Sequence, residues 1–107
     1  MCRFEDLEPD RGATALVHGQ AVALFRMAAG EVYALGNHDP FARSAMLARG
    51  IVGRRGEVPF VASPAHGHGF DLRTGRCLDD IHVSVPAYCV RVVEGVVYVG
   101  HRKVDAA

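Results

Sequence analysis

Short apolar segments separated by glycine-containing turns dominate the N-terminal third of the chain. Apolar residues gather at positions 13–17, 21–27 and 32–35, with turns at His18-Gly19 and Ala29-Gly30 between them. Segments of this length on either side of tight glycine turns are typical of antiparallel strands. The pattern predicts a meander of three strands.

A second β signal lies near the C-terminus. Apolar segments at 88–93 and 96–99 flank the dipeptide Glu94-Gly95. A two-residue loop that ends in glycine is a strong local signal for a hairpin, and the abundant valines suit a pleated, half-buried surface. We therefore expect a C-terminal hairpin.

The middle of the chain is rich in glycine and proline. Short apolar segments at 60–62 and 70–72 predict two strands around a loop, and 41–49 could hold a short helix. We expect one domain over 1–107, in which a regular β base carries a loop-rich subdomain over about 36–75. Long ordered loops on a rigid scaffold are frequent sites of function.

Charge and hydropathy exclude several classes of function. Twelve basic residues balance twelve acidic ones among 107 residues, so nucleic-acid binding is not expected. The longest apolar run, at 21–25, is far shorter than the ~20 residues of a membrane span. An acidic N-terminus unlike a signal peptide and three sparse cysteines indicate a reducing, cytoplasmic location.

The segment Ser63-Pro64-Ala65-His66-Gly67-His68-Gly69-Phe70-Asp71 carries the most information. It resembles the second cluster-binding loop of Rieske iron–sulfur domains, Cys-Pro-x-His-Gly-x-x-Phe-Asp, with Ser63 in place of the cysteine. The first loop of that family, Cys-x-His, corresponds to Asn37-His38-Asp39. The resemblance spans nearly the whole chain. It implies an all-β, Rieske-like fold: an antiparallel β-sandwich or barrel base with a loop-rich, cluster-binding-like subdomain.

The ligands of a Rieske cluster are mostly missing from these loops. A Rieske centre needs two thiolates and two imidazoles, and only His66 remains at the four matching positions. A serine hydroxyl resists deprotonation and is a poor substitute for a thiolate. Cys2, Cys77 and Cys89 lie outside both loops. We expect no [2Fe–2S] cluster and no other cofactor in this chain.

The loops resemble a narrower family more closely, the small subunit of assimilatory NAD(P)H-dependent nitrite reductase. The shared stretches include Asn37-His38-Asp39-Pro40-Phe41, Ala62-Ser63-Pro64 and Phe70-Asp71-Leu72-Arg73-Thr74-Gly75. The resemblance implies a cytoplasmic, non-catalytic subunit. Its partner would be a large catalytic subunit that carries FAD, a [4Fe–4S] cluster and sirohaem and reduces nitrite to ammonium in nitrate assimilation. In keeping with this, the chain has no glycine-rich nucleotide fingerprint.

The resemblance also implies that Asn37, Asp39, Ser63 and His66 mark vestigial ligand positions. Two interpretations of this region remain. His38, Asp39, His66 and His68 could bind a single metal ion, or Asp39 and His66 could hydrogen-bond across the loops in place of a cluster. We favour hydrogen bonding because the spacing alone gives no tetrahedral site.

Two other functions compete with the small-subunit interpretation. One is a Rieske-type ferredoxin that carries electrons, and the other is a stand-alone metal-binding or interaction domain that uses the histidine-rich loop. Smaller features are also open to two interpretations. Cys77 could be a reactive thiol or a buried small residue, and Asp79-Asp80 a partner contact or a solvated turn. Phe41 could anchor an interface or cap the core of its own loop.

Overall fold

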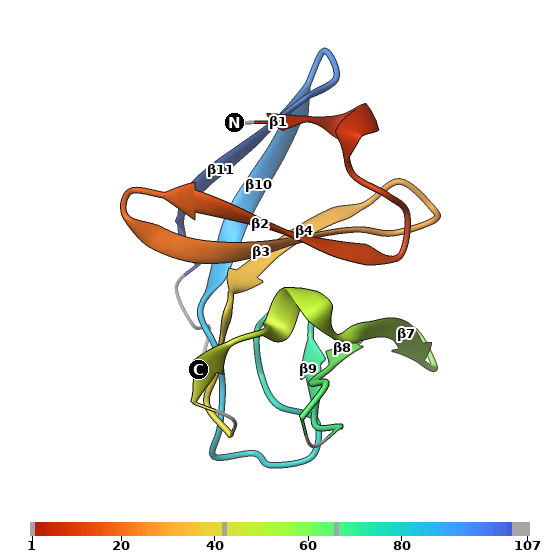
Figure 1. The fold of residues 1–107 in the computed structure, drawn as a ribbon. Helices are drawn as coiled ribbons and strands as arrows, with labels where there is room; N and C mark the ends of the chain where they lie inside the picture. The colour runs from red at the N-terminus through yellow and green to blue at the C-terminus, as the bar shows by residue number, and fades with distance from the viewer. Residues whose placement is uncertain (1, 42, 66, 104–107) are drawn as a thin grey trace.

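A computed structural model describes residues 2–41, 43–65 and 67–103. Its largest element is a curled antiparallel sheet of six strands in the order β1-β11-β10-β4-β3-β2, which forms the upper part of Figure 1. The strands are β1 (Cys2–Arg3), β2 (Arg11–Val17), β3 (Gln20–Arg26), β4 (Val32–Gly36), β10 (Ala87–Val93) and β11 (Val96–Arg102). A short 3-10 helix, η1 (Phe4–Asp6), follows β1.

The predicted meander and hairpin are confirmed. β2 pairs with β3, β3 with β4, and β10 with β11, all antiparallel. Two of the two-residue turns share one geometry: His18 and Gly19 have φ of 50° and 78°, and Glu94 and Gly95 have φ of 50° and 78°. Two consecutive positive φ values define the turn type whose twist matches that of the flanking strands.

The region between β4 and β10 forms the lower part of Figure 1. It contains the two-stranded sheet of β5 (His38–Asp39) and β6 (Ser44–Ala45) and the 3-10 helix η2 (Leu47–Arg49). A three-stranded sheet follows, made of β7 (Ile51–Arg55), β8 (Val58–Ala62) and β9 (Gly69–Asp71). The short helix that 41–49 could hold is reduced to one 3-10 turn, because the described part of that segment forms β6 and then η2.

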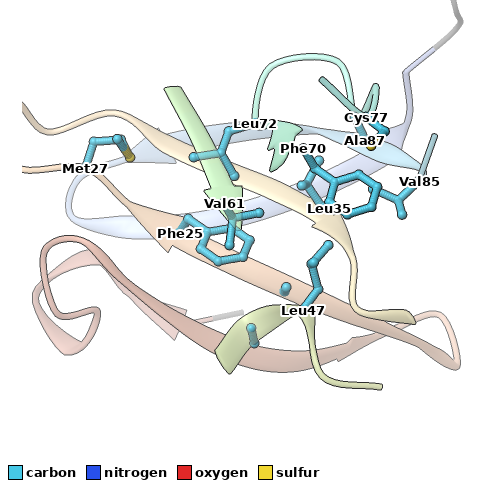
Figure 2. Close-up of a cluster of buried hydrophobic side chains, with 12 residues drawn as sticks. Phe25, Met27, Leu35, Leu47, Val61, Phe70, Leu72, Cys77, Val85 and Ala87 are labelled. Carbon is cyan, nitrogen blue, oxygen red and sulfur yellow. The ribbon is translucent and has the colours of Figure 1, made fainter. Parts of the chain in front are cut away.

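Strand β3 is buried on both faces, which explains its unbroken apolar run. Val22 and Leu24 face a cluster inside the curled sheet, whereas Ala23 and Phe25 face a second cluster between the sheet and the lower region. Successive side chains of a strand point to opposite faces, so one strand contributes to both clusters. Figure 2 shows the second cluster, where Phe25 lies beside Val61 of β8.

The second cluster fixes the lower region against the sheet. Phe25 and Leu35 of the sheet and Leu47, Val61 and Phe70 of the lower region are each less than 2% exposed. Burial of such side chains stabilises a fold by about 1.5–3 kcal/mol each. The two loops that match the Rieske ligand loops are therefore held against a packed base. In the part of the chain that the structure describes, no helix is long and apolar enough to cross a membrane.

Candidate functional site

A buried hydrogen bond joins the two loops that match the Rieske ligand loops. Ser63 Oγ, at the end of β8, donates to Asp39 Oδ2 in β5. Asp39 is fully buried and Ser63 is 2% exposed. The other carboxylate oxygen, Oδ1, accepts a bond of 2.9 Å from the backbone N–H of Phe41. A buried carboxylate needs such partners, because an unsatisfied charge in the interior is costly.

Asn37 holds the first loop to η2. Among the described residues, the hydrogen bonds that its oxygen atoms accept come from η2 and not from Asp39 or Ser63. Its Oδ1 accepts a bond of 2.8 Å from the N–H of Ala48, and its carbonyl oxygen accepts one of 3.0 Å from Leu47. Asn37 is 4% exposed. These two bonds satisfy N–H groups at the start of η2 that have no partner inside the turn. The buried amide therefore positions the backbone of the lower region.

A ring contact is the second link between the loops. Phe41 of the first loop stacks on His68 of the second, with ring centroids 3.7 Å apart and planes 7° from parallel. Phe41 also lies 6.2 Å from the Phe70 ring in a tilted arrangement and packs on the core cluster. Of the two interpretations of Phe41, the structure favours the one in which it caps the core of its own loop. The sequence did not indicate the partner of this ring.

An ion pair holds the far end of the second loop. The Arg55 guanidinium of β7 donates to both carboxylate oxygens of Asp79, at 3.0 and 3.3 Å. Asp79 Oδ2 also accepts a bond of 2.7 Å from the N–H of Gly69. The hydrogen bonds from Arg55 and then from Gly69 lower the pKa of Asp79 below its ordinary value. Sequence reasoning missed this contact, because nothing local relates Arg55 to a residue 24 positions away.

The candidate metal ligands do not come together among the described residues. His38 is exposed on β5, whereas its neighbour Asp39 is buried on the opposite side. His68 is stacked on Phe41, and His66 lies outside the described residues. In the described ranges, no group of three or more histidine, cysteine or acidic side chains is placed to hold a metal ion.

The described donors also do not fit a [2Fe–2S] cluster, which needs thiolate sulfur on one of its irons. Asn37 uses its amide oxygen on η2, and Asp39 and Ser63 bind each other. The three cysteines are free and lie elsewhere. Cys2 is in β1, Cys89 is in β10 beside His101, and Cys77 is buried in the core cluster. Cys77 thus has the surroundings of a small apolar residue.

Comparisons with known proteins identify the family of this fold. The model of the Rieske-like [2Fe-2S] domain family matches residues 1–100. The nitrite reductase (NADH) small subunit of Escherichia coli K12 is 38% identical over 98 residues, which cover 91% of each chain. The chain belongs to the nitrite reductase small-subunit family, within the Rieske-like domain family.

Two further proteins are similar to this chain, one in its structure and one in a segment of its sequence. A crystal structure described as an NADH-dependent nitrite reductase small subunit from Mycobacterium tuberculosis superposes with a TM-score of 0.90 at 45% identity. That alignment covers 99% of this chain and 94% of the other. The nitrite reductase [NAD(P)H] large subunit of Klebsiella oxytoca is 34% identical over 106 residues, 99% of this chain but only 11% of that protein. In that organism, a segment of the large subunit itself matches the small-subunit domain.

Proposed function

We propose that this chain is the non-catalytic small subunit of a cytoplasmic NAD(P)H nitrite reductase. It would bind and support a large subunit that reduces nitrite to ammonium in nitrate assimilation. The observation that carries the proposal is the 38% identity to the Escherichia coli small subunit across 91% of both chains. The three free cysteines agree with a reducing compartment.

The Klebsiella oxytoca protein supports the choice of partner. A segment similar to this whole chain forms about a tenth of a protein described as a nitrite reductase large subunit. Covalent attachment keeps two domains at a high effective concentration. A domain that is attached to the large subunit in one organism is therefore expected to bind it as a separate chain in another.

The buried loop contact supports a role without electron transfer. In this proposal Asn37, Asp39 and Ser63 occupy vestigial ligand positions, as does His66, and the Asp39–Ser63 bond holds the loops where a cluster would otherwise join them. Residues 1–107 would act as one domain, with the loop-rich part over about 36–75. FAD, [4Fe–4S] and sirohaem would all reside in the large subunit, as the family resemblance implies.

Co-purification with the large subunit tests this function. The large subunit from the same host would be affinity-tagged, expressed with and without this chain, and assayed for nitrite-dependent NAD(P)H oxidation. We expect the two chains to co-purify, and this chain alone to oxidise no NAD(P)H. Failure of the untagged chain to co-purify, or nitrite-dependent oxidation by this chain alone, would contradict the proposal.

A further inference from the structure

A positively charged groove lies between the turn after β9 and the end of β11. It has a volume of about 440 Å³. Arg73 and Arg76 from the turn after β9 line it, together with Arg102 at the end of β11 and Lys103 directly after that strand. These are four of the twelve basic residues of a chain that has no net charge. Among the described residues that line the groove, Asp71 is the one carboxylate.

Asp71 offsets only part of this charge. Its two oxygens accept bonds of 3.2 and 3.1 Å from Nε and Nη2 of Arg73. Lys103 Nζ donates to the carbonyl oxygen of Arg73 at 3.0 Å. Because this acceptor is neutral, the positive charge of Lys103 is not offset by the bond. No carboxylate in the described part of the chain forms an ion pair with Lys103 or Arg102. The described residues that line the groove therefore carry an excess of positive charge, which attracts an anionic group.

The walls of the groove are fixed by backbone contacts. The N–H of Val85 donates to the carbonyl oxygen of Gly75 at 2.8 Å, and that of Lys103 donates to Ala87 at 2.7 Å. Gly75 has φ of +82°, and a Cβ atom there would overlap the carbonyl oxygen of Val85. The basic side chains thus project from a preformed frame, which lowers the entropy cost of binding.

The arrangement suits an extended acidic peptide better than a single phosphate group. The charges come from two separate segments, 73–76 and 102–103, and no helix of the described structure begins in the groove to direct several N–H groups at one anion. Arginine pairs with carboxylates through two parallel hydrogen bonds. Several carboxylates spaced along a peptide can each meet one of these cations.

We infer that this groove binds an acidic segment of the nitrite reductase large subunit. The inference rests on the proposed function and adds the surface and the chemistry of the contact. Charge pairs at the edge of an interface mainly set the association rate and the salt dependence of binding. Binding to the large subunit should therefore weaken with added salt, and reversal of the charge in the groove should weaken it further.

The test uses the doubly substituted variant Arg102→Glu/Lys103→Glu. Both side chains are exposed at the end of β11, so the core is not disturbed. The matched control is Arg3→Glu/Arg11→Glu, which makes the same change of charge at two exposed residues outside the groove. The variant Arg102→Gln/Lys103→Gln removes charge without reversing it. Thermal unfolding would establish that each variant is folded.

Dissociation constants for the tagged large subunit would be measured at about 50 mM and about 300 mM NaCl, where screening differs strongly. We expect the Glu variant to bind about tenfold more weakly at low salt, the Gln variant to be intermediate, and the control to stay within about twofold. Equal binding by wild type and folded groove variants would overturn the groove inference alone. Absence of wild-type binding would instead contradict the proposed function.

A second measurement addresses the source of the anion. Inorganic pyrophosphate and NADPH would be titrated into the chain and into the complex. We expect neither to bind at micromolar concentration, and we expect a glutamate-rich peptide from the large subunit to compete for the groove. Tight binding of pyrophosphate that is lost in Arg102→Glu/Lys103→Glu would assign the groove to a phosphate ligand and overturn the inference.

Discussion

Ser63 Oγ donates a hydrogen bond to Asp39 Oδ2, and this buried contact joins two loops that are 24 residues apart in sequence. Both residues stand where Rieske domains place cluster ligands, according to the family resemblance. A metal cluster holds such loops with several coordination bonds. Here a carboxylate and a hydroxyl, together with the Phe41–His68 ring contact, provide the link.

Removal of the hydroxyl tests how much this link contributes to stability. Ser63→Ala takes away one donor to a fully buried carboxylate. We expect a loss of about 1–3 kcal/mol in the free energy of unfolding, which corresponds to a fall of several degrees in Tm. Urea unfolding at neutral pH would measure it. Ser84→Ala, at an exposed serine, is the control and should change little; equal effects of the two substitutions would refute the role of the bond.

The Arg55–Asp79 pair makes part of the stability depend on pH. Because the pKa of Asp79 is lowered in the folded chain, its contribution is present above the unfolded value of about 3.9 and is lost as the pH falls through the folded value. Asp79→Asn should therefore destabilise the chain at neutral pH, and the difference from wild type should shrink below about pH 4.

Urea unfolding of both proteins at neutral pH and at about pH 3 would show this convergence. Asp6→Asn serves as the control, since Asp6 is exposed and has no ion pair in the described structure. A gap between Asp79→Asn and wild type that stays constant with pH would show that the carboxylate contributes through its shape alone.

Alanine substitutions at two glycines with nearly the same φ separate the cost of backbone strain from the cost of steric overlap. Gly19 has φ of +78° with open space around it, whereas a Cβ at Gly75, with φ of +82°, would overlap Val85. We expect Gly19→Ala to cost roughly 1–2 kcal/mol from the left-handed conformation. Gly75→Ala should cost at least about 1 kcal/mol more, because overpacking adds to the strain. Thermal or urea unfolding of both variants would check the order, and equal losses would contradict it.

The regular part of the fold is readable from local sequence, because its signals are local. His18-Gly19 and Glu94-Gly95 supply the two positive φ values that a tight hairpin turn requires, and apolar segments flank each of them. The strand β7 was missed because Ile51 is 75% exposed and the charged residues Arg54 and Arg55 are exposed as well. Its place in the sheet depends on pairing with β8, which no pattern within the strand reveals.

The lower region departs from the prediction for a similar reason. The segment before Arg49 has helix-compatible residues, but the side chain and carbonyl of Asn37 bind the N–H groups of Ala48 and Leu47 and set a single 3-10 turn. The candidate loops could be located from the motif around Ser63. The contacts that fill them could not, because each joins side chains from segments far apart in the sequence.

The most direct test of a Rieske-like domain without its own redox centre is the iron and acid-labile sulfide content of the chain. The protein would be purified without a histidine tag from cells supplied with iron, under conditions that keep a known Rieske ferredoxin loaded as a control. We expect far less than one iron per chain, no acid-labile sulfide and a colourless protein. About two irons and two sulfides per chain, the content of a [2Fe–2S] centre, would contradict this and make the chain an electron carrier.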